Sequence, residues 1–179
     1  EDDILRCFLH LKHVPHIDSK GKAHMKNLVI LGAGTAGTIM LNKLLPELGG
    51  EWNITIVDEY ETHYYQPGFL FIPFGIYNKN DVMKPKREFL PSGAEVIFEN
   101  IDLIEAEKNQ VKLGNGRILP YDYLIIATGT KINPGETEGM LGDSWQKNIF
   151  DFYTIEGACA LGQFFKYWEG GKLVLNITE

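Results

Sequence analysis

The chain has 179 residues, 44% of them hydrophobic and 23% charged, which is typical of a soluble globular chain of one domain, or of one domain plus part of another. Its formal net charge of -7 argues against nucleic acid as a partner, because phosphate binding requires clustered lysine and arginine. The two cysteines, Cys7 and Cys159, lie far apart; they form no disulfide framework or metal-ligand spacing and are typical of a reducing compartment.

The first 24 residues are polar and rich in histidine, without a sustained hydrophobic period. We interpret residues 1–24 as a leader or a foreign upstream segment. The alternative is a metal site, but His10, His13 and His16 have no cysteine or carboxylate partner at ligand spacing. We therefore expect no metal, and we expect the first folded domain to begin at Met25.

From Met25 onward the pattern predicts an α/β fold. Residues 27–31 are a continuous apolar run followed by glycine, as expected of a strand buried on both faces. Residues 35–45 carry apolar side chains on one face and predict a helix that ends before Pro46, because proline disfavours helical geometry in the residue before it. Residues 53–57 predict a second strand.

The segment from 89 to 119 is richer in strand patterns. Four short runs lie there, at 95–98, 103–104, 111–113 and 117–119. The turn Gly114-Asn115-Gly116 between the last two is a strong hairpin signal. A continuous apolar strand is predicted at 123–127. Near the end of the sequence, residues 172–175 predict a strand that would open a second domain.

A glycine-rich sequence follows the first strand and opens the helix. Its first glycine would make a tight turn, its second would let the backbone approach a pyrophosphate, and its third would allow close packing of the helix. The helix N-terminus adds unpaired N–H groups and a positive dipole end. The pattern predicts a dinucleotide site, and the alternative is a glycine turn without a ligand. The three glycines are Gly32, Gly34 and Gly37.

The second strand ends in Asp58 and Glu59, at about the spacing expected between the glycine loop and a ribose-binding acid. A carboxylate there can accept hydrogen bonds from the ribose hydroxyls, whereas it would repel the 2′-phosphate of NADP. The pair favours FAD or NAD over NADP and does not separate the first two.

Residues 119–130, Leu-Pro-Tyr-Asp-Tyr-Leu-Ile-Ile-Ala-Thr-Gly-Thr, resemble the second FAD signature of the glutathione-reductase-like flavoproteins, the FAD-dependent pyridine nucleotide-disulfide oxidoreductases. In that family a β-meander separates the first βαβ unit from a strand ending in Ala-Thr-Gly, and both patterns are present. The resemblance implies a Rossmann-like FAD-binding domain with a parallel sheet and an inserted β-meander over residues 25–135. A linker and the start of a second dinucleotide-binding-like domain would occupy 136–179. The FAD contacts that the resemblance implies are Gly32, Gly34, Thr35, Ala36, Gly37, Asp58, Ile101 (at the adenine), Ala127, Thr128 and Gly129.

Within that superfamily, residues 64–68, Tyr-Tyr-Gln-Pro-Gly, resemble an aromatic-x-Pro element of sulfide:quinone oxidoreductases and flavocytochrome c sulfide dehydrogenases. This resemblance implies that Gln66 and Pro67 lie beside the FAD. Glutathione reductase and its disulfide relatives carry a Cys-x-x-x-x-Cys pair after the first acid, and the lack of cysteine between Cys7 and Cys159 excludes that subfamily. The implied activity passes two electrons from sulfide or another small sulfur donor through FAD to a quinone-type acceptor. Only the N-terminal half of such a protein is covered, so we expect the chain to be truncated relative to the functional protein.

No catalytic residue is assigned. Cys159 lies several residues into a helix predicted at 154–161, and we interpret it as packing because a reactive cysteine needs surroundings that stabilise its thiolate. We interpret the apolar cluster at 69–74 as domain core or as an interface with sequence that is missing from this chain. The alternatives for that cluster are a lid on the flavin or a contact with a quinone or membrane surface.

Two other functions stay open. A type II NADH:quinone or ferredoxin-type NAD(P)H reductase would need a second glycine-rich loop after the strand at 172–175, where the chain has Asn176-Ile177-Thr178-Glu179 instead. A non-catalytic flavin- or nucleotide-binding module is the other alternative. We expect the protein to lie in the cytoplasm, because no run approaches the ~20 apolar residues of a membrane span and the N-terminus lacks the order of a signal peptide. We also expect a homo-oligomer. Peripheral contact with a membrane is the alternative location.

Overall fold

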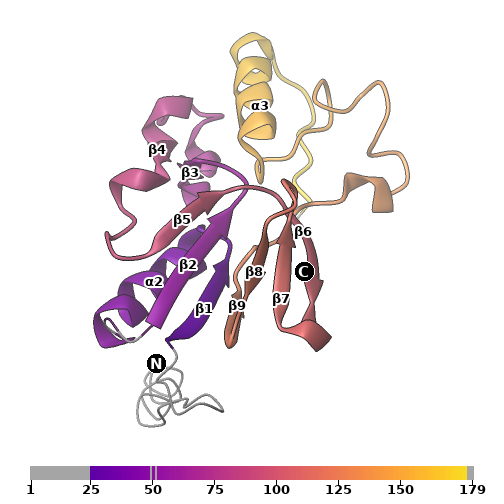
Figure 1. Cartoon of the computed structure of the whole chain (residues 1–179). Coiled ribbons are helices and arrows are strands. Elements are labelled where there is room, and N and C mark those ends of the chain that lie inside the picture. Colours follow the sequence, from indigo (N-terminus) through magenta and orange to yellow (C-terminus); the bar gives the residue numbers. More distant parts are fainter. Residues whose placement is uncertain (1–24, 49, 51, 177–179) are drawn as a thin grey trace. The chain divides into compact units, whose positions relative to one another are not determined.

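The computed structural model describes residues 25–48, 50 and 52–176 (Figure 1). The predictions made for residues 1–24, including those for the histidines, lie outside the described residues. The chain divides into two compact units. The first contains the residues up to His63 together with Pro85–Thr130, and the second contains Tyr64–Lys84 and the residues from Lys131 onward. The chain therefore passes from one unit to the other three times.

The core of the first unit is a parallel sheet of four strands in the order β5-β2-β1-β9. The strands are β1 (Lys26–Leu31), β2 (Trp52–Asp58), β5 (Glu95–Phe98) and β9 (Tyr123–Ile126). The last four residues of β1 are buried, as expected for a central strand that is covered on both faces. Because all three pairings are parallel, the carboxyl ends of the four strands meet at one edge. The predicted α/β class and parallel sheet are confirmed.

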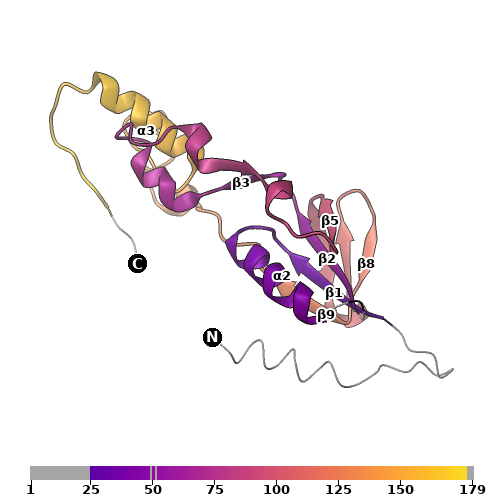
Figure 2. The same cartoon turned by 90° about the vertical axis from the view of Figure 1, so that its left-hand side faces the viewer.

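Helix α2 (Thr35–Leu48) covers one face of this sheet (Figure 2). Its buried leucines, Leu41, Leu44 and Leu48, belong to the same apolar cluster as the strand residues beneath them. The prediction that the helix ends before Pro46 is wrong, because it continues to Leu48. A proline here removes one backbone hydrogen bond close to the helix end, and burial of Leu48 holds the last turn against the sheet.

An antiparallel sheet of three strands covers the other face. It consists of β6 (Ile101–Glu105), β7 (Gln110–Leu113) and β8 (Ile118–Pro120). Its apolar side chains pack against the alternate residues of β1 and β2. This is the predicted β-meander, and the tight turn at 114–116 is confirmed by the bond from the Gly116 N–H to the Leu113 carbonyl over 2.8 Å. The run at 95–98 lies outside the meander, because it forms β5 of the parallel sheet.

The second unit is built on helix α3 (Ile155–Tyr167), whose first turn is capped by the Thr154 hydroxyl accepting from the Gly157 N–H over 3.0 Å. The helix packs on a 3-10 helix at Gln66–Phe71. The buried apolar residues of the unit are Phe69, Ile72, Val82, Ile155 and Ala158. Of the apolar cluster at 69–74, Phe69 and Ile72 lie in this core, whereas Phe74 is exposed.

The remaining elements are short. Strands β3 (Thr62–Tyr64) and β4 (Met83–Pro85) form a two-stranded sheet where the chain passes between the units. The other 3-10 helices are at Lys79–Val82, Lys86–Glu88, Ala106–Lys108 and Pro134–Glu136.

The strand predicted at 172–175 is not formed, and this prediction is wrong. Residues 168–176 have no regular secondary structure, and Leu173, Val174 and Leu175 are exposed. A strand needs a neighbour to take its backbone hydrogen bonds, and within the described part of the chain no strand pairs with this segment.

Candidate functional site

The residues singled out in the first unit gather at the carboxyl edge of the parallel sheet. Leu31 of β1 pairs with Val57 of β2 on one side and with Ile126 of β9 on the other. The glycine loop, Asp58 and the Ala-Thr-Gly segment begin at or directly beyond these strand ends. In open α/β sheets, ligands bind outside the carboxyl ends of the strands where the order of the sheet reverses, as it does here at β1.

The loop after β1 passes very close to the segment after β9. The Gly32 N–H donates to the Val57 carbonyl over 2.7 Å, and the Ala127 N–H donates to the Leu31 carbonyl over 2.7 Å. A β-carbon at Gly32 would overlap the Ala127 carbonyl, and the φ of 96° at Gly32 lies in the region that favours glycine. The two sequence motifs are therefore joined at this point.

The other two glycines of the motif differ in their surroundings. A β-carbon at Gly37 would overlap the Gly32 carbonyl, so this glycine permits the loop and the helix to pack closely. Beside Gly34, in contrast, no atom lies within 4 Å of the position that a β-carbon would take. The packing of the protein does not require glycine there, whereas a phosphate approaching the backbone does. The first turn of α2 contains no acidic side chain that would compete for its N–H groups.

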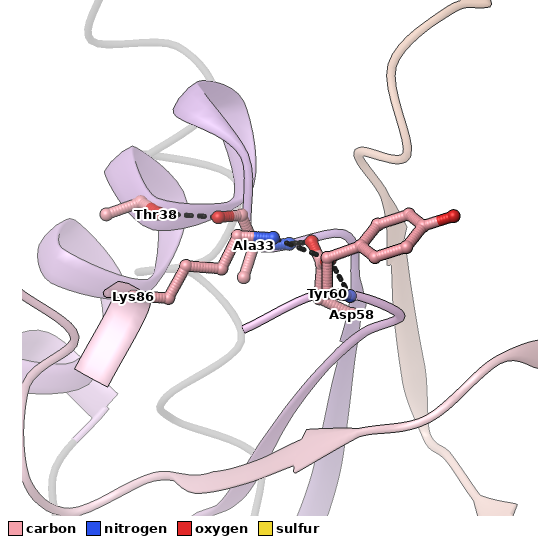
Figure 3. Close-up of polar contacts among 5 residues, drawn as sticks. All are labelled: Ala33, Thr38, Asp58, Tyr60 and Lys86. Atoms are coloured by element: carbon pink, nitrogen blue, oxygen red, sulfur yellow. Dashed lines mark hydrogen bonds and ion pairs between the residues drawn. The ribbon is translucent and has the colours of Figure 1, made fainter. Parts of the chain in front are cut away.

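Asp58 is held by three groups of its own chain (Figure 3). Its Oδ2 accepts the Ala33 N–H over 2.6 Å, and its Oδ1 accepts the Tyr60 N–H over 2.9 Å. Oδ1 also lies 2.6 Å from the Lys86 Nζ, and the two side chains of this ion pair are only 14% and 6% exposed. The acid thus stands at the predicted place, beside the glycine loop. No motif of the sequence predicts that Lys86 lies beside this acid.

Charged neighbours shift the pKa values of Tyr60 and His63, two side chains near Asp58. The Glu59 carboxylate raises the pKa of the Tyr60 phenol, first through a side-chain hydrogen bond and then through its charge. Burial lowers the pKa of His63, the positive charge of Lys86 lowers it further, and Asp58 opposes both. The His63 ring packs edge-on against Phe89, with ring centres 5.1 Å apart. The folded protein therefore disfavours the protonated form of His63.

The other predicted contacts of the first unit lie along the same edge. Ile101 begins β6 just after Glu99, whose N–H donates to the Asp58 carbonyl over 2.8 Å. The Ile101 side chain is partly buried against the core beneath the meander. Thr128 and Gly129 directly follow Ala127, and Gly129 has a φ of 74°. The structure thus brings these residues to the edge that carries the glycine loop.

Three residues of interest belong to the second unit. Gln66 donates from its Nε2 to the Tyr153 carbonyl over 3.2 Å, and Pro67 stands in the first turn of the 3-10 helix. Cys159 is a free, partly buried thiol on α3 that packs against the core of the unit. Its predicted position inside a helix is confirmed.

In the described part of the chain, no group of three or more His, Cys, Asp or Glu side chains could hold a metal ion. Neither of its two α-helices combines the length and the apolar character needed to cross a membrane.

The chain belongs to the pyridine nucleotide-disulphide oxidoreductase family, whose sequence profile matches residues 26–161. Proteins of this family typically bind FAD. The residues at the sheet edge suit such a group: there is open space beside Gly34, a helix N-terminus free of acids, and a carboxylate at the end of β2. The family resemblance drawn from residues 32–37 and 119–130 is confirmed.

Two relatives and one solved structure that the chain resembles are named quinone oxidoreductases. The mitochondrial sulfide:quinone oxidoreductase of Dictyostelium discoideum is 26% identical over 159 residues, covering 87% of this chain and 35% of the relative. A type II NADH:quinone oxidoreductase of Staphylococcus haemolyticus is 30% identical over 140 residues, covering 77% of this chain and 33% of the relative. The solved structure of the Aquifex aeolicus sulfide:quinone oxidoreductase superposes with a TM-score of 0.64 at 26% identity, covering 79% of this chain and 32% of that protein. The chain spans about a third of the length of these relatives.

Proposed function

We propose that this chain is the FAD-binding part of a flavoprotein oxidoreductase that takes two electrons from a sulfur donor and passes them to a quinone-type acceptor. The observation that carries the FAD site is the open space beside Gly34, at a helix N-terminus and next to the Asp58 carboxylate. A close approach of pyrophosphate to the backbone is the physical reason for a glycine whose own surroundings leave it free.

Each part of the dinucleotide has candidate residues. The pyrophosphate would be held by the glycine loop and the first turn of α2, the ribose by Asp58, with Glu59 beside it, and the adenine by Ile101. The remaining proposed contacts are Gln66, Pro67, Ala127, Thr128 and Gly129. When bound, FAD supplies the redox chemistry through its isoalloxazine ring, and the protein binds and orients it. We also propose that the FAD-binding domain covers residues 25–135, with 136–179 leading into a second domain.

The sulfur donor and the quinone acceptor are supported by relatives. Sulfide:quinone oxidoreductases from Dictyostelium discoideum and Aquifex aeolicus match most of the chain. A quinone acceptor favours peripheral contact with a membrane, and we propose that the protein works there as a homo-oligomer. No residue of this chain is assigned to the sulfur chemistry.

NADH is the second candidate donor, because a type II NADH:quinone oxidoreductase also matches most of the chain. A strand at 172–175 that leads into a turn without glycine would favour the sulfur donor over NADH. That strand is not formed, so these residues do not separate the two donors.

The test has two steps. The purified chain is first titrated with FAD, and saturable binding with a flavin absorption spectrum is expected. The protein that contains this chain, loaded with FAD, is then mixed without oxygen with sulfide or with NADH. Bleaching by sulfide alone supports the sulfur donor, bleaching by NADH alone replaces it with NADH, and bound flavin that neither donor reduces indicates a binding module. Absence of FAD binding would overturn the proposal.

A further inference from the structure

Most hydrogen-bond acceptor positions of the Asp58 carboxylate are occupied by donors of its own chain. A carboxylate offers about four acceptor positions on its two oxygens. Oδ1 accepts from the Lys86 Nζ and from the Tyr60 N–H, at 2.6 Å and 2.9 Å. Oδ2 accepts from the Ala33 N–H at 2.6 Å. The position that is left lies on Oδ2.

Lys86 is fixed independently of any ligand. Its backbone N–H donates to the Glu61 carbonyl over 2.7 Å, and its carbonyl accepts the Phe89 N–H over 3.2 Å. The residue is 5% exposed. Separating a buried ammonium from its carboxylate leaves an uncompensated charge, which is strongly unfavourable. The ion pair is therefore expected to persist when a nucleotide binds beside it.

We infer that Lys86 is a positioning residue for the ribose: it occupies Oδ1, so that Asp58 accepts one ribose hydroxyl through Oδ2 instead of two. This inference rests on the proposed nucleotide site. It narrows the expectation that this carboxylate accepts hydrogen bonds from the ribose hydroxyls to one hydroxyl and one oxygen. The two ribose hydroxyls then contribute unequally to binding, because only one of them has a charged acceptor in Asp58.

ADP is a suitable probe, because it carries the ribose and the pyrophosphate without the flavin. Binding of ADP, 2′-deoxy-ADP and 3′-deoxy-ADP to the nucleotide-free chain is measured by calorimetry. One deoxy analogue is expected to bind about tenfold or more weakly than ADP, as for loss of a hydrogen bond to a charged group, and the other to stay within about twofold of ADP. In Lys86→Met, Oδ1 gains a free acceptor position, and both analogues should bind several-fold more weakly than ADP.

Two controls separate this role from a general loss of structure. Lys86→Arg keeps a cation on Oδ1 and should keep the unequal pattern. Arg87→Met removes the neighbouring cation, which is exposed and lies 3.5 Å from Glu61. This variant should also keep the unequal binding of the two deoxy analogues. Circular dichroism and thermal unfolding establish that each variant is folded.

The inference fails if both deoxy analogues lose affinity equally in the parent, or if a folded Lys86→Met keeps the parent pattern. The parent measurement needs no substitution, so a variant that does not fold leaves the test intact. If the parent does not bind ADP at all, the proposed nucleotide site is wrong, and the inference falls with it. That outcome differs from binding with equal losses, which removes the role of Lys86 alone.

Discussion

Gly32 lies against the carbonyl of Ala127 with no space for a side chain between them. The first residue of the glycine loop and the first residue of the Ala-Thr-Gly segment therefore support each other at the carboxyl edge of the sheet. Two motifs that are usually considered separate cofactor contacts act here as one structural joint. A change at this joint should alter stability even when no nucleotide is bound.

Substitution of Gly32 by alanine is expected to lower the free energy of unfolding by about 1–3 kcal/mol or more, because the new methyl group overlaps backbone atoms at a positive φ. The matched control is Gly34→Ala, which meets no atom within 4 Å and should change the free energy by less than about 0.5 kcal/mol. Urea denaturation of the nucleotide-free chain measures both. Equal effects of the two substitutions would show that the joint is not rigid.

A larger side chain at Gly34 should separate folding from flavin binding. Gly34→Val is expected to fold, because the position is open, and to lose FAD, because the side chain fills the space proposed for the pyrophosphate. The flavin absorbance per protein after purification and the far-ultraviolet circular dichroism report on the two properties. A folded variant that retains full flavin would remove the glycine loop from the site.

Asp58→Ala should reduce FAD retention and also destabilise the fold. It removes a ligand acceptor, with a cost of about 1.5–3 kcal/mol per charged hydrogen bond, and it leaves the Lys86 ammonium buried without its carboxylate. Breaking a buried pair from one side costs about 3–5 kcal/mol. The double variant Asp58→Ala/Lys86→Met is expected to recover part of that stability in urea denaturation. Additive losses in the double variant would mean that the pair contributes little.

The lowered pKa of His63 predicts a pH dependence of stability. The unfolded chain binds a proton at this residue near pH 6.5, whereas the folded protein resists it. The unfolded state therefore binds more protons as the pH falls through 6.5, and stability is lost in that direction and is full above it. His63→Gln should flatten the decline in urea midpoint on going below pH 6.5. An unchanged slope in the variant would exclude His63 as its source.

Cys159→Ser in the protein that contains this chain should leave sulfide-dependent flavin reduction within a few-fold of the parent. The thiol lies on α3 against an apolar core, in the second turn of the helix rather than at the helix N-terminus that can activate a cysteine. Stopped-flow reduction by sulfide measures the effect. A collapse of the rate, with FAD content and folding intact, would make Cys159 a redox residue.

The sequence predicted the features that depend on local chemistry. The loop at 32–37, the turn at 114–116 and the strand before Ala127 each carry their signal within a few residues. The pairing of Asp58 with Lys86 could not be predicted, because it joins two segments that no motif or period connects. The end of α2 was predicted wrongly for a related reason. Burial of Leu48, which depends on contact with the sheet, outweighs the local effect of Pro46.

The discontinuous second unit has a consequence for synthesis of the protein. Phe69, Ile72 and Val82 leave the ribosome long before Ile155 and Ala158, the residues that cover them. The first unit has all its strands once β9 is made, while the insertion at Tyr64–Lys84 still exposes its apolar side chains. Nascent chains in that interval are prone to aggregate. A fragment that stops after Thr130 would keep the whole parallel sheet and yet be poorly soluble, so a stable fragment must extend through α3.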